Sequence, residues 1–519
     1  MNFAAELELQ ARSQPEAPAL FFDDQMYTWR DIDERASRFA NVLIEHGLEP
    51  GDHMAIFAPN IPRFVFAFYG AMKAGVVPMP LNLRFEPGEI DYMIDHVEHD
   101  AVFTAAPVAE LFEEVGLSPV KHVYAAGDVD LETADTDVHD FDALLADAST
   151  DFEAVPQEMD DPCFFMHTSG TTGRAKPVIA THGNIYAHDM AYIQHIGFTT
   201  DDVALTAVPL FHNSGLNLKL TTFTMLGAPQ VLLQQWDAEA ALSAIEEHDV
   251  TYLFTIPTML YDLVNRDPEE SENAYDVTSL EYAPTGGQNV PVDPVTEFED
   301  RYGATVLPGY GLTETMPGIV MNRPDHRKLE TDGVPIRNAC DIRVVDPEDW
   351  QTEVPTGELG ELLVSGDVVS PGYYRRPEKN EEDFEVDEDG RRWLHTGDIV
   401  RQDDDGFISI EDRVDSMIVS GGENVYPNQV ENVLYEIDGI DEAVVVGESH
   451  ERWGERVAAA VVASDETLTE EDIFDYFKNH TQLANYKRPR NVLFLDELPR
   501  SGTGKIDRFT IQSEYFAEQ

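Results

Sequence analysis

Short apolar runs alternate with helix-length segments between about residues 50 and 310, and this alternation constrains the fold more than any other feature. Met54–Phe57 is a predicted strand, and Pro62–Ala74 is a predicted helix that ends at Gly75. Further strands are predicted at Val203–Leu210, Gln230–Leu233, Tyr252–Ile256, Leu280–Ala283 and Thr305–Leu307. Strands separated by helices form βαβ units, whose strands run parallel. The sequence therefore predicts an α/β fold.

The pattern changes twice towards the C-terminus. From about residue 333, strands bounded by Gly, Pro and Asp predict an antiparallel, barrel-like region. After Arg413, alternating helices and strands, among them a predicted helix at Glu470–Asn479, predict a small α+β unit of ordinary domain size. We therefore expect one domain over residues 1–413 and a second over 414–519. Residues 104–160 are expected to be irregular, acidic surface, and residues 376–392 a charged loop.

A glycine- and hydroxyl-rich stretch follows the apolar run Cys163–Met166. Its sequence, from Thr168 to Lys176, is Thr-Ser-Gly-Thr-Thr-Gly-Arg-Ala-Lys. Small residues let consecutive backbone N–H groups converge on an anion, and Lys176 adds a positive charge. We expect a strand, a phosphate-binding loop and then a helix beginning near His182. A flexible polar turn is the alternative, and the spacing differs from GxxxxGK[ST].

The charge of the chain is extreme, with 99 acidic residues against 34 Lys and Arg and a net charge of −65. Because hydrophobic residues still make up 42 %, the chain should fold and carry the acids on its surface. Self-repulsion of this size is screened in concentrated salt, so we expect a cytoplasm of high salt content. The same charge disfavours nucleic-acid binding. Concentrated KCl should be needed for cooperative folding.

Several features favour a cytoplasmic protein. Cys163 and Cys340 lie far apart and outside any CxxC, which is typical of a reducing compartment. No signal peptide is visible at the acidic N-terminus. No apolar run approaches the roughly 20 residues that span a bilayer. The sequence leaves a homodimer open.

Lysine is scarce, with nine residues in the chain, and two of them lie near the C-terminus. Lys487 and Lys505 stand among Arg488, Arg490, Arg500 and Arg508. A basic cluster in so acidic a chain indicates a bound polyanion. Local charge balance against Asp496, Glu497 and Asp507 is the alternative. The glycine-rich segment Leu498–Arg508 would present Lys505 on a mobile loop, which could reach a distant site and withdraw.

Three further motifs carry polar side chains at turns. In Tyr310–Thr315, Tyr310 could stack on a base, Thr313 could bond a phosphate and Glu314 could hold Mg²⁺. A helix entry with Thr313 as N-cap is the alternative. In Thr396-Gly397-Asp398, the aspartate could accept from both hydroxyls of a ribose; an ordinary Asp turn is the alternative. Arg413 could grip a nucleotide, and Asp415 could serve as a hinge.

Taken together and in this order, the motifs resemble those of the adenylate-forming superfamily, which includes acyl-CoA synthetases, luciferases and peptide-synthetase adenylation domains. The matching segments are residues 168–176, 209–212, 285–287, 310–314, 396–398, the Arg413 segment and residues 499–505. The resemblance implies a large N-terminal domain of two α/β subdomains and a β-barrel, with a small mobile C-terminal lid. It implies that a carboxylic acid and ATP give an acyl-adenylate and pyrophosphate, and that a thiol then gives a thioester and AMP.

The resemblance also implies roles for single residues. Lys505 would bridge the acid and the α-phosphate, stabilising charge that builds during attack. Asp415 would be the hinge, Ser420, Gly421 and Gly422 would face the CoA channel, and His212 would stand between this channel and the acid pocket; for His212 a packed core histidine is the alternative. The β- and γ-phosphates would be held by the loop at 168–176, with Thr168, Ser169, Gly170, Thr171, Thr172, Gly173 and Lys176. The adenine wall would be Gly286, Gly287, Gln288 and Tyr310, the ribose would be held by Asp398 and Arg413, and Gly311 and Thr313 would also bind the nucleotide. The Mg²⁺ ligands would be Thr168 and Glu314.

Some positions depart from the family's usual pattern, among them Ala175 and Pro177 around the loop lysine and Asp412 before Arg413. None removes a charged catalytic group. An AMP-forming acid–CoA ligase is the leading hypothesis. A stand-alone adenylation enzyme that loads a carrier protein is the nearest rival, and a luciferase-like oxygenase and a non-catalytic homologue are others. No GxSxG elbow occurs, which disfavours a serine hydrolase.

The acid itself is the main open point. The pocket is expected to draw on residues 252–259, 212–217 and 309–318. The apolar residues Leu216, Ile256 and Met316 indicate an apolar guest. We expect a medium- or long-chain fatty acid first and an aryl acid second.

Overall fold

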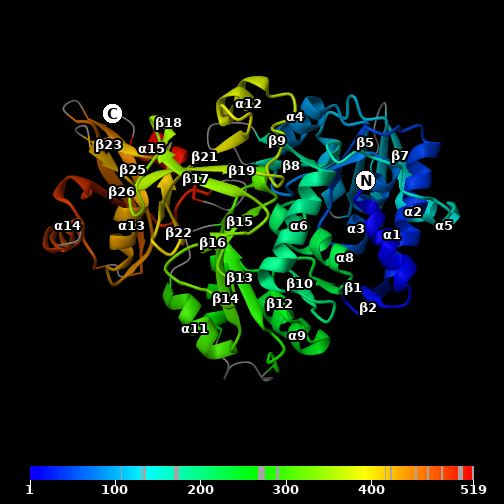
Figure 1. Ribbon diagram of the computed structural model, residues 1–519, viewed down its shortest axis with the longest axis horizontal. Helices are drawn as coiled ribbons and strands as arrows, with labels where there is room; N and C mark the ends of the chain where they lie inside the picture. The colour runs from blue at the N-terminus through cyan, green and yellow to red at the C-terminus, as the bar shows by residue number, and fades with distance from the viewer. Residues whose placement is uncertain are drawn as a thin grey trace. The chain divides into compact units, whose positions relative to one another are not determined.

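The computed structural model describes residues 1–106, 108–129, 131, 136–168, 175–266, 275–287, 292–414, 416–420, 423–450, 453–464, 467–480, 483–500 and 506–516. The chain divides into two compact units, whose elements are labelled in Figure 1. One unit comprises residues 1–342, 364–394 and 406–408, and the other comprises residues 343–363, 395–405 and 409–519. The predicted domain boundary at residues 413 and 414 stays a prediction.

A nine-stranded sheet in the first unit has the order β16-β15-β14-β13-β12-β10-β11-β1-β2. The strands from β14 to β1 pair in parallel, as the alternation predicts. Helices α9 (Ala238–His248), α10 (Pro257–Val264) and α11 (Val292–Tyr302) share a buried apolar core with it. The strands are β1 (Pro18–Phe22), β2 (Gln25–Thr28), β10 (Ala204–Thr206), β11 (Gln230–Leu232), β12 (Tyr252–Leu253), β13 (Tyr282–Gly286), β14 (Thr305–Gly311), β15 (Gly318–Met321) and β16 (Val334–Pro335).

A second, five-stranded sheet is parallel throughout and has the order β4-β3-β5-β6-β7. Its strands are β3 (His53–Phe57), β4 (Val77–Pro80), β5 (Ala101–Ala105), β6 (His122–Ala126) and β7 (Asp137–Asp140). The expectation that residues 104–160 are irregular is wrong, because β6, β7 and α5 (Phe141–Asp147) lie there. The apolar run of β6 is only four residues long, too short to stand out between charged neighbours.

The predicted order of strand, loop and helix around the hydroxyl-rich loop is also wrong. Strand β8 (Pro162–Thr168) pairs antiparallel with β9 (Lys176–Thr181), and only then does α6 (His182–Ile196) begin. Buried Val178 and Ala180 make β9 a strand that packs like its partner. Thr181 caps α6 by accepting from the Asn184 N–H, and the Asn184 side chain accepts from the Thr181 N–H in return. The loop therefore closes a hairpin.

A six-stranded sheet contains β18-β17-β19-β21-β20, with β22 paired to β21. Its strands are β17 (Asp341–Asp346), β18 (Asp349–Glu353), β19 (Leu359–Ser365), β20 (Phe384–Val386), β21 (Arg392–Gln402) and β22 (Ile408–Arg413). The expectation of a loop over residues 376–392 is wrong, because α12 (Pro377–Asp383) and β20 lie in it. None of the α12 residues is buried, so the helix has no apolar periodicity that would reveal it.

The C-terminal part of the second unit is the predicted α+β arrangement. A sheet of β23 (Ile418–Ser420), β24 (Glu423–Val425), β25 (Ile440–His450), β26 (Gly454–Ala463) and β27 (Asn491–Phe494) is covered by α13 (Pro427–Tyr435) and α14 (Glu470–Asn479). Helix α14 has the predicted bounds, because Thr469 and Asp472 form a capping box at its start. Helix α15 (Arg508–Tyr515) packs against β25 through a smaller core.

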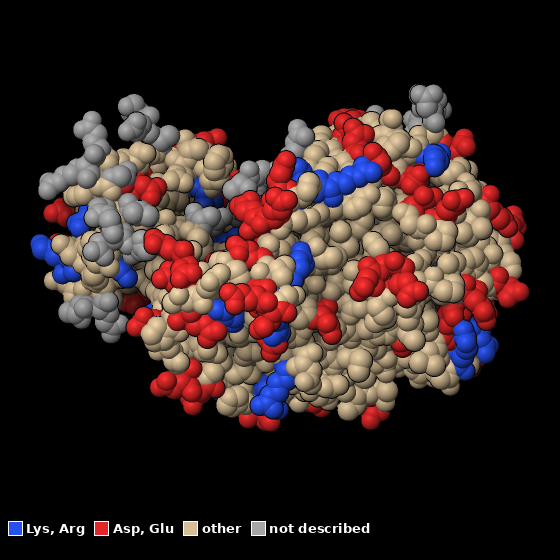
Figure 2. Space-filling view, turned by 45° about the horizontal axis from the view of Figure 1, so that its top comes forward, with Lys and Arg blue, Asp and Glu red and all other residues tan. Residues whose placement is uncertain are grey.

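The remaining helices lie in the first unit, apart from η4 (Asn485–Lys487). They are α1 (Ala4–Ser13), α2 (Trp29–Glu45), α3 (Pro62–Ala74), α4 (Pro87–Val97), η1 (Val108–Glu113), α7 (Asn213–Gly215), η2 (Leu216–Thr221), α8 (Thr222–Leu226) and η3 (Thr313–Thr315). Helix α3 has the predicted bounds and ends at Gly75 in the left-handed conformation. Acidic side chains are spread over the face drawn in Figure 2, with few basic ones among them.

Candidate active site

The ends of the β8–β9 hairpin carry the first predicted site residues. Thr168 and Lys176 lie directly opposite each other in the strand register. The Oγ1 atom of Thr168 is buried and has no hydrogen-bond partner among the described residues. A buried hydroxyl without a partner is costly, so this oxygen is suited to receive a ligand. Ser169, Gly170, Thr171, Thr172 and Gly173 lie outside the described residues.

Glu314 is held beside this hairpin by the segment that precedes α12. The 3₁₀ helix η3, which contains Glu314, lies against both β8 and β9. The Ser370 N–H donates to the Glu314 carbonyl oxygen (2.8 Å), and the Tyr374 N–H donates to the Pro177 carbonyl oxygen (2.8 Å). These bonds bring Thr168, Lys176 and Glu314 into one region, although they are far apart in sequence.

Tyr373 lies at the centre of this region and was missed by the sequence analysis. Its hydroxyl is 2.7 Å from Glu314 Oε1 and 2.9 Å from Asp383 Oδ2. Burial and the two carboxylates raise the pKa of Tyr373 well above its usual range, so the hydroxyl keeps its proton. Because the Tyr373 hydroxyl has one proton, it can donate a hydrogen bond to only one of the two carboxylates at a time. Lys176 Nζ lies 4.8 Å from the centre of the Tyr373 ring. The Pro371-Gly372 pair that precedes Tyr373 is the one feature of the local sequence that could have drawn attention to this position.

The same region fits a hard cation. Mg²⁺ prefers oxygen ligands and keeps several waters and substrate phosphates in its shell. The region offers the unpartnered Thr168 hydroxyl and the Glu314 carboxylate, which shares Tyr373 with the Asp383 carboxylate. A cation would relieve the repulsion between these two acids. The predicted ligands Thr168 and Glu314 therefore suit magnesium bound with a nucleotide.

The predicted adenine wall stands at the carboxyl ends of two neighbouring strands. Gly286 ends β13, while Tyr310 and Gly311 end β14, and the strands run parallel with Gly286 opposite Gly309. A Cβ on Gly286 would lie 2.4 Å from the Gly309 carbonyl oxygen, so only glycine allows this approach. Gly287 has a φ of +85°, a left-handed conformation that favours glycine. Gln288 lies outside the described residues.

Thr313 opens the helix η3 rather than capping it, since the N-cap is Leu312. The alternative interpretation of Thr313 as an N-cap is therefore wrong. The Thr313 carbonyl oxygen accepts from Asn213 Nδ2 at 3.2 Å, which ties η3 to the segment that follows His212. This bond places the Phe211–Asn213 segment beside the Glu314 helix.

His212 lies near a second histidine, His167, at a ring-centre distance of 6.0 Å. His167 immediately precedes Thr168 and packs on Phe85. Burial, with a smaller contribution from His212, lowers the pKa of His167 to about 3, so His167 is neutral at physiological pH. His167 was also missed, because a histidine inside an apolar strand gives no signal of its own.

Asp398 and Arg413 lie together in the second unit. Arg413 Nη1 donates to Asp398 Oδ1 (3.1 Å) and to the Thr396 carbonyl oxygen (3.0 Å). The Asp398 side chain is almost fully buried, whereas Arg413 is partly exposed. The two predicted ribose residues are thus neighbours. Burial raises the pKa of the adjacent Asp412 to about 6, although its oxygens accept from the Arg413 and Asn428 N–H groups.

The remaining predicted residues of the second unit are only partly described. Ser420 ends β23, whereas Asp415, Gly421, Gly422 and Lys505 lie outside the described residues. The basic C-terminal cluster is at least partly balanced locally, because Arg508 pairs with Glu431 (2.6 Å) and Arg500 pairs with Glu442. These two arginines are therefore paired within the protein, but with Glu431 and Glu442 rather than with Asp496, Glu497 or Asp507, the acids named in the alternative interpretation.

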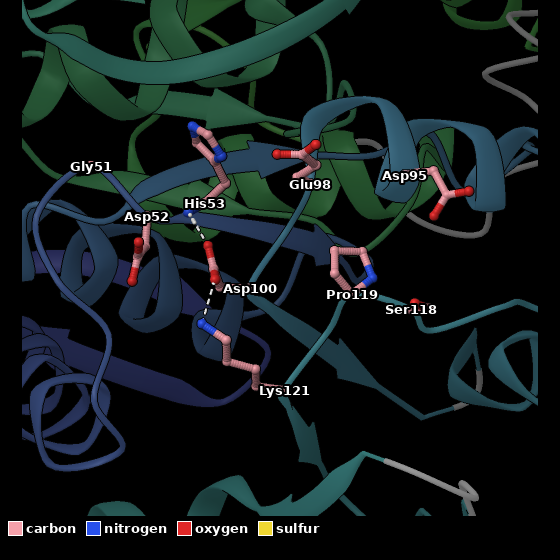
Figure 3. A pocket seen from close by; sticks show the side chains of 9 residues that line it. All are labelled: Gly51, Asp52, His53, Asp95, Glu98, Asp100, Ser118, Pro119 and Lys121. Carbon is pink, nitrogen blue, oxygen red and sulfur yellow. Dashed lines mark hydrogen bonds and ion pairs between the residues drawn. The ribbon is translucent and has the colours of Figure 1, made fainter.

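A surface cavity of about 550 Å³ lies beside the amino-terminal ends of β3, β5 and β6 in the five-stranded sheet (Figure 3). Four carboxylates line it, together with His53 and Lys121. Asp100 accepts from Lys121 Nζ (2.8 Å) and from the His53 N–H (3.3 Å), as the dashed lines show. None of the predicted site residues lines this cavity, and no function is assigned to it.

Comparison with known proteins identifies the class. Residues 7–374 match the AMP-binding enzyme family and residues 429–505 match the C-terminal domain of AMP-binding enzymes. A feruloyl-CoA synthase of Amycolatopsis sp is 34 % identical over 500 residues, covering 96 % of each chain. A long-chain-fatty-acid–CoA ligase of Mycobacterium tuberculosis is 32 % identical, covering 95 % of this chain and 94 % of the relative.

Solved structures agree. The o-succinylbenzoate CoA synthetase of Bacillus subtilis in complex with its acyl-adenylate intermediate has a TM-score of 0.85 at 29 % identity, covering 99 % of each chain. The same synthetase with ATP and magnesium has a TM-score of 0.82 at 30 % identity, covering 98 % of this chain and 99 % of the other.

The chain belongs to the AMP-binding enzyme family and, within it, to the AMP-forming CoA ligases. Enzymes of this type use ATP with Mg²⁺ and take CoA as co-substrate. The predicted α/β fold, with a large N-terminal domain and a smaller C-terminal one, is confirmed. Among the described residues, none of the helices combines the length and apolar character needed to cross a membrane.

Proposed function

We propose that this chain joins a carboxylic acid to CoA through an acyl-adenylate, with the residues predicted above in the roles given to them. The observation that carries the proposal is the convergence of Thr168, Lys176 and Glu314 around Tyr373. Lys176 would contact the outer phosphates, and Thr168 and Glu314 would hold the magnesium that bridges and neutralises them. Tyr373 would orient Glu314. Asp398 and Arg413 would hold the ribose, and Lys505 would stabilise the charge that builds during attack on the α-phosphate.

The test separates the two half-reactions. The Lys505→Ala variant should lose adenylate formation by at least about a hundredfold, yet still convert supplied acyl-AMP and CoA into thioester. Pyrophosphate release measures the first step and thioester formation the second, both in concentrated KCl. Equal loss of the two steps would refute the role of Lys505. If the unaltered protein forms no AMP with any acid, the ligase function itself is wrong.

The chemical class of the acid substrate can be narrowed further by considering a lysine beside the predicted acid pocket. Lys219 lies on η2, directly after residues 212–217, and its side chain is 0 % exposed. Its Nζ atom has no hydrogen-bond partner among the described residues and lies 4.0 Å from the Tyr252 ring centre and 4.8 Å from that of Phe254. Burial lowers the pKa of Lys219 well below its usual range. Tyr252 and Phe254 belong to the predicted pocket segment 252–259.

Other polar atoms near the pocket segments also lack partners. Both side-chain polar atoms of Asn217 are buried without a hydrogen bond among the described residues, and so is His188 Nε2. A Cβ on Gly318, which ends the third pocket segment, would lie 3.7 Å from that His188 nitrogen. A hydrocarbon guest leaves such groups unpaired, at a cost of about 1–3 kcal/mol each. A guest with an oxygen function at this end would satisfy them.

We infer that the substrate body carries a second oxygen function, such as a ring hydroxyl, a ketone or a carboxylate. This inference favours the aryl-acid alternative, or another oxygenated acid, over the fatty acid expected first. The relatives named above act on feruloyl, fatty and succinylbenzoate substrates, so they leave the choice open. The inference rests on the ligase function and on Lys219 facing the acid.

Matched acids test the inference. The wild-type protein should use octanedioate or 4-hydroxyphenylpropanoate with a kcat/KM at least about tenfold above octanoate or phenylpropanoate. The Lys219→Met variant should lose that preference while still releasing AMP with octanoate. A wild-type preference for octanoate that Lys219→Met leaves unchanged would overturn the substrate inference while leaving the ligase function standing.

We also propose that the enzyme works in a cytoplasm of high salt content. The support is the net charge of −65 and the acidic surface in Figure 2. Screening by concentrated salt removes most of the repulsion between exposed carboxylates. The midpoint of thermal unfolding should therefore rise steeply with KCl, and a midpoint insensitive to salt would contradict the proposal.

A further inference from the structure

Three histidines meet at the edge of the five-stranded sheet, in the first unit and outside the region described above. His46 caps the C-terminus of α2, His122 begins β6 and His139 lies in the edge strand β7. Helix α2 and strand β7 are labelled in Figure 1. One ring nitrogen of each lies within 4.8 Å of those of the other two. All three side chains are partly buried, which leaves a path for a small ion.

The spacing of the rings matches that of a metal-bound tripod. His122 Nδ1 and His139 Nε2 are 3.1 Å apart, and the three ring centres are 4.5, 4.9 and 5.3 Å apart. Two nitrogens bound to a tetrahedral zinc ion at about 2.0–2.1 Å are about 3.3 Å apart, with ring centres about 5 Å apart. Without a metal, the 3.1 Å approach is a hydrogen bond between His122 and His139, and a metal ion would take the place of its proton.

The surroundings suit a cation as well. Tyr124 Oη lies 3.0 Å from His46 Nδ1, which orients that ring as an outer partner orients a metal ligand. Glu45 and Asp137 place negative charge nearby.

We propose that His46, His122 and His139 bind one divalent transition-metal ion of the kind that imidazole prefers, with Zn²⁺ as the first candidate. The fourth position would hold water. The ion would tie the C-terminal end of α2 to the edge strand β7, which pairs with β6 and contacts α5. No step of the ligase reaction passes through this site, so its role is to stabilise the sheet edge.

Zinc alone tests the proposal on the full-length protein, stripped with a chelator and kept in concentrated KCl. Titration against a chromophoric zinc chelator should show one tight site per chain, and the midpoint of thermal unfolding should rise when zinc is added. The Co²⁺-loaded protein should show the visible absorption of a tetrahedral nitrogen-ligated ion. These readouts do not depend on ligase activity.

Variants distinguish a specific zinc site from nonspecific zinc binding. His122→Ala and the milder His139→Gln should abolish the tight site and the rise in unfolding midpoint, and Tyr124→Phe should weaken affinity about tenfold. His248→Ala is the matched control, because His248 is also partly buried and stacks on Phe21 with a ring-centre distance of 4.4 Å. Absence of a tight site in the wild-type protein, or a site that both histidine variants retain, would overturn the proposal.

Discussion

Two lysines of the first unit are both 0 % exposed, yet their surroundings are opposite. Lys73 Nζ lies 2.5 Å from Asp33 Oδ1, 2.7 Å from Ser37 Oγ and 3.1 Å from Glu8 Oε1. Lys219 Nζ lies over the faces of Tyr252 and Phe254 and has no hydrogen bond among the described residues. The first lysine joins α3 to α1 and α2, whereas the second faces aromatic rings at the predicted acid pocket.

The contrast indicates that the two lysines contribute differently to the stability of the protein. A buried charge that is fully hydrogen-bonded belongs to the architecture, because its partners would be left uncompensated without it. A buried amine without a partner costs stability in the empty protein, and it is worth keeping only if a ligand satisfies it. The comparison therefore predicts that removing the two amines changes stability in opposite directions.

The largest effect is expected for Lys73→Met. Asp33 and Glu8 would keep buried or half-buried charge without a counterion, at a cost of about 3–5 kcal/mol. The midpoint of denaturant unfolding in concentrated KCl measures this loss. Lys121→Met is the control, because the exposed Lys121–Asp100 pair should contribute less than about 1 kcal/mol. Equal losses of stability for the two substitutions would show that the buried ion pairs of Lys73 stabilise the fold no more than an exposed pair does.

Lys219→Met should act in the opposite direction and raise the free energy of unfolding of the ligand-free protein by about 1–3 kcal/mol. Methionine fills a similar volume between the two rings without a buried amine. The same unfolding measurement, made without acid or nucleotide, checks the sign. A destabilised variant would mean that the amine is satisfied in the native protein, and the contrast with Lys73 would fail.

The pH dependence of the free energy of unfolding tests the same comparison, with a smaller expected effect per pH unit. The pKa of Lys219 is lowered on folding, whereas an unfolded lysine titrates near about 10.4. Between these two values the unfolded chain binds more protons, so the free energy of unfolding rises with pH, by at most about 1.4 kcal/mol per pH unit. The stability advantage of Lys219→Met should therefore shrink between neutral pH and about pH 10. An advantage that is constant with pH would contradict the lowered pKa.

The smallest effect on stability is expected at a second unpartnered group, the Thr168 hydroxyl. Thr168→Val should change the free energy of unfolding by less than about 0.5 kcal/mol, because no hydrogen bond to a described residue is lost. The same substitution should lower kcat/KM for MgATP by about 10–100-fold, and Thr168→Ser should restore most of it. A marked loss of stability with normal kinetics would assign this hydroxyl to the fold.

The sequence was sufficient where the signal is local. Helices α3 and α14 have their predicted bounds because Gly75 in one and a capping box in the other end or begin the helix within a few residues. The parallel core of the nine-stranded sheet followed from the spacing of apolar runs. Glu314, Asp398 and Arg413 could be named because their neighbours in sequence form recognisable motifs.

Only the tertiary structure decided which distant residues meet. Strand β6 and the hairpin partner β9 escaped notice because their burial depends on strands elsewhere in the chain. Tyr373 reaches Glu314, Lys219 has no hydrogen-bond partner among the described residues, and three histidines gather at one sheet edge, although nothing in the local sequence distinguishes these residues. Hydrogen bonding and desolvation depend on the atoms within a few ångströms, and those atoms are chosen by long-range packing rather than by sequence neighbours.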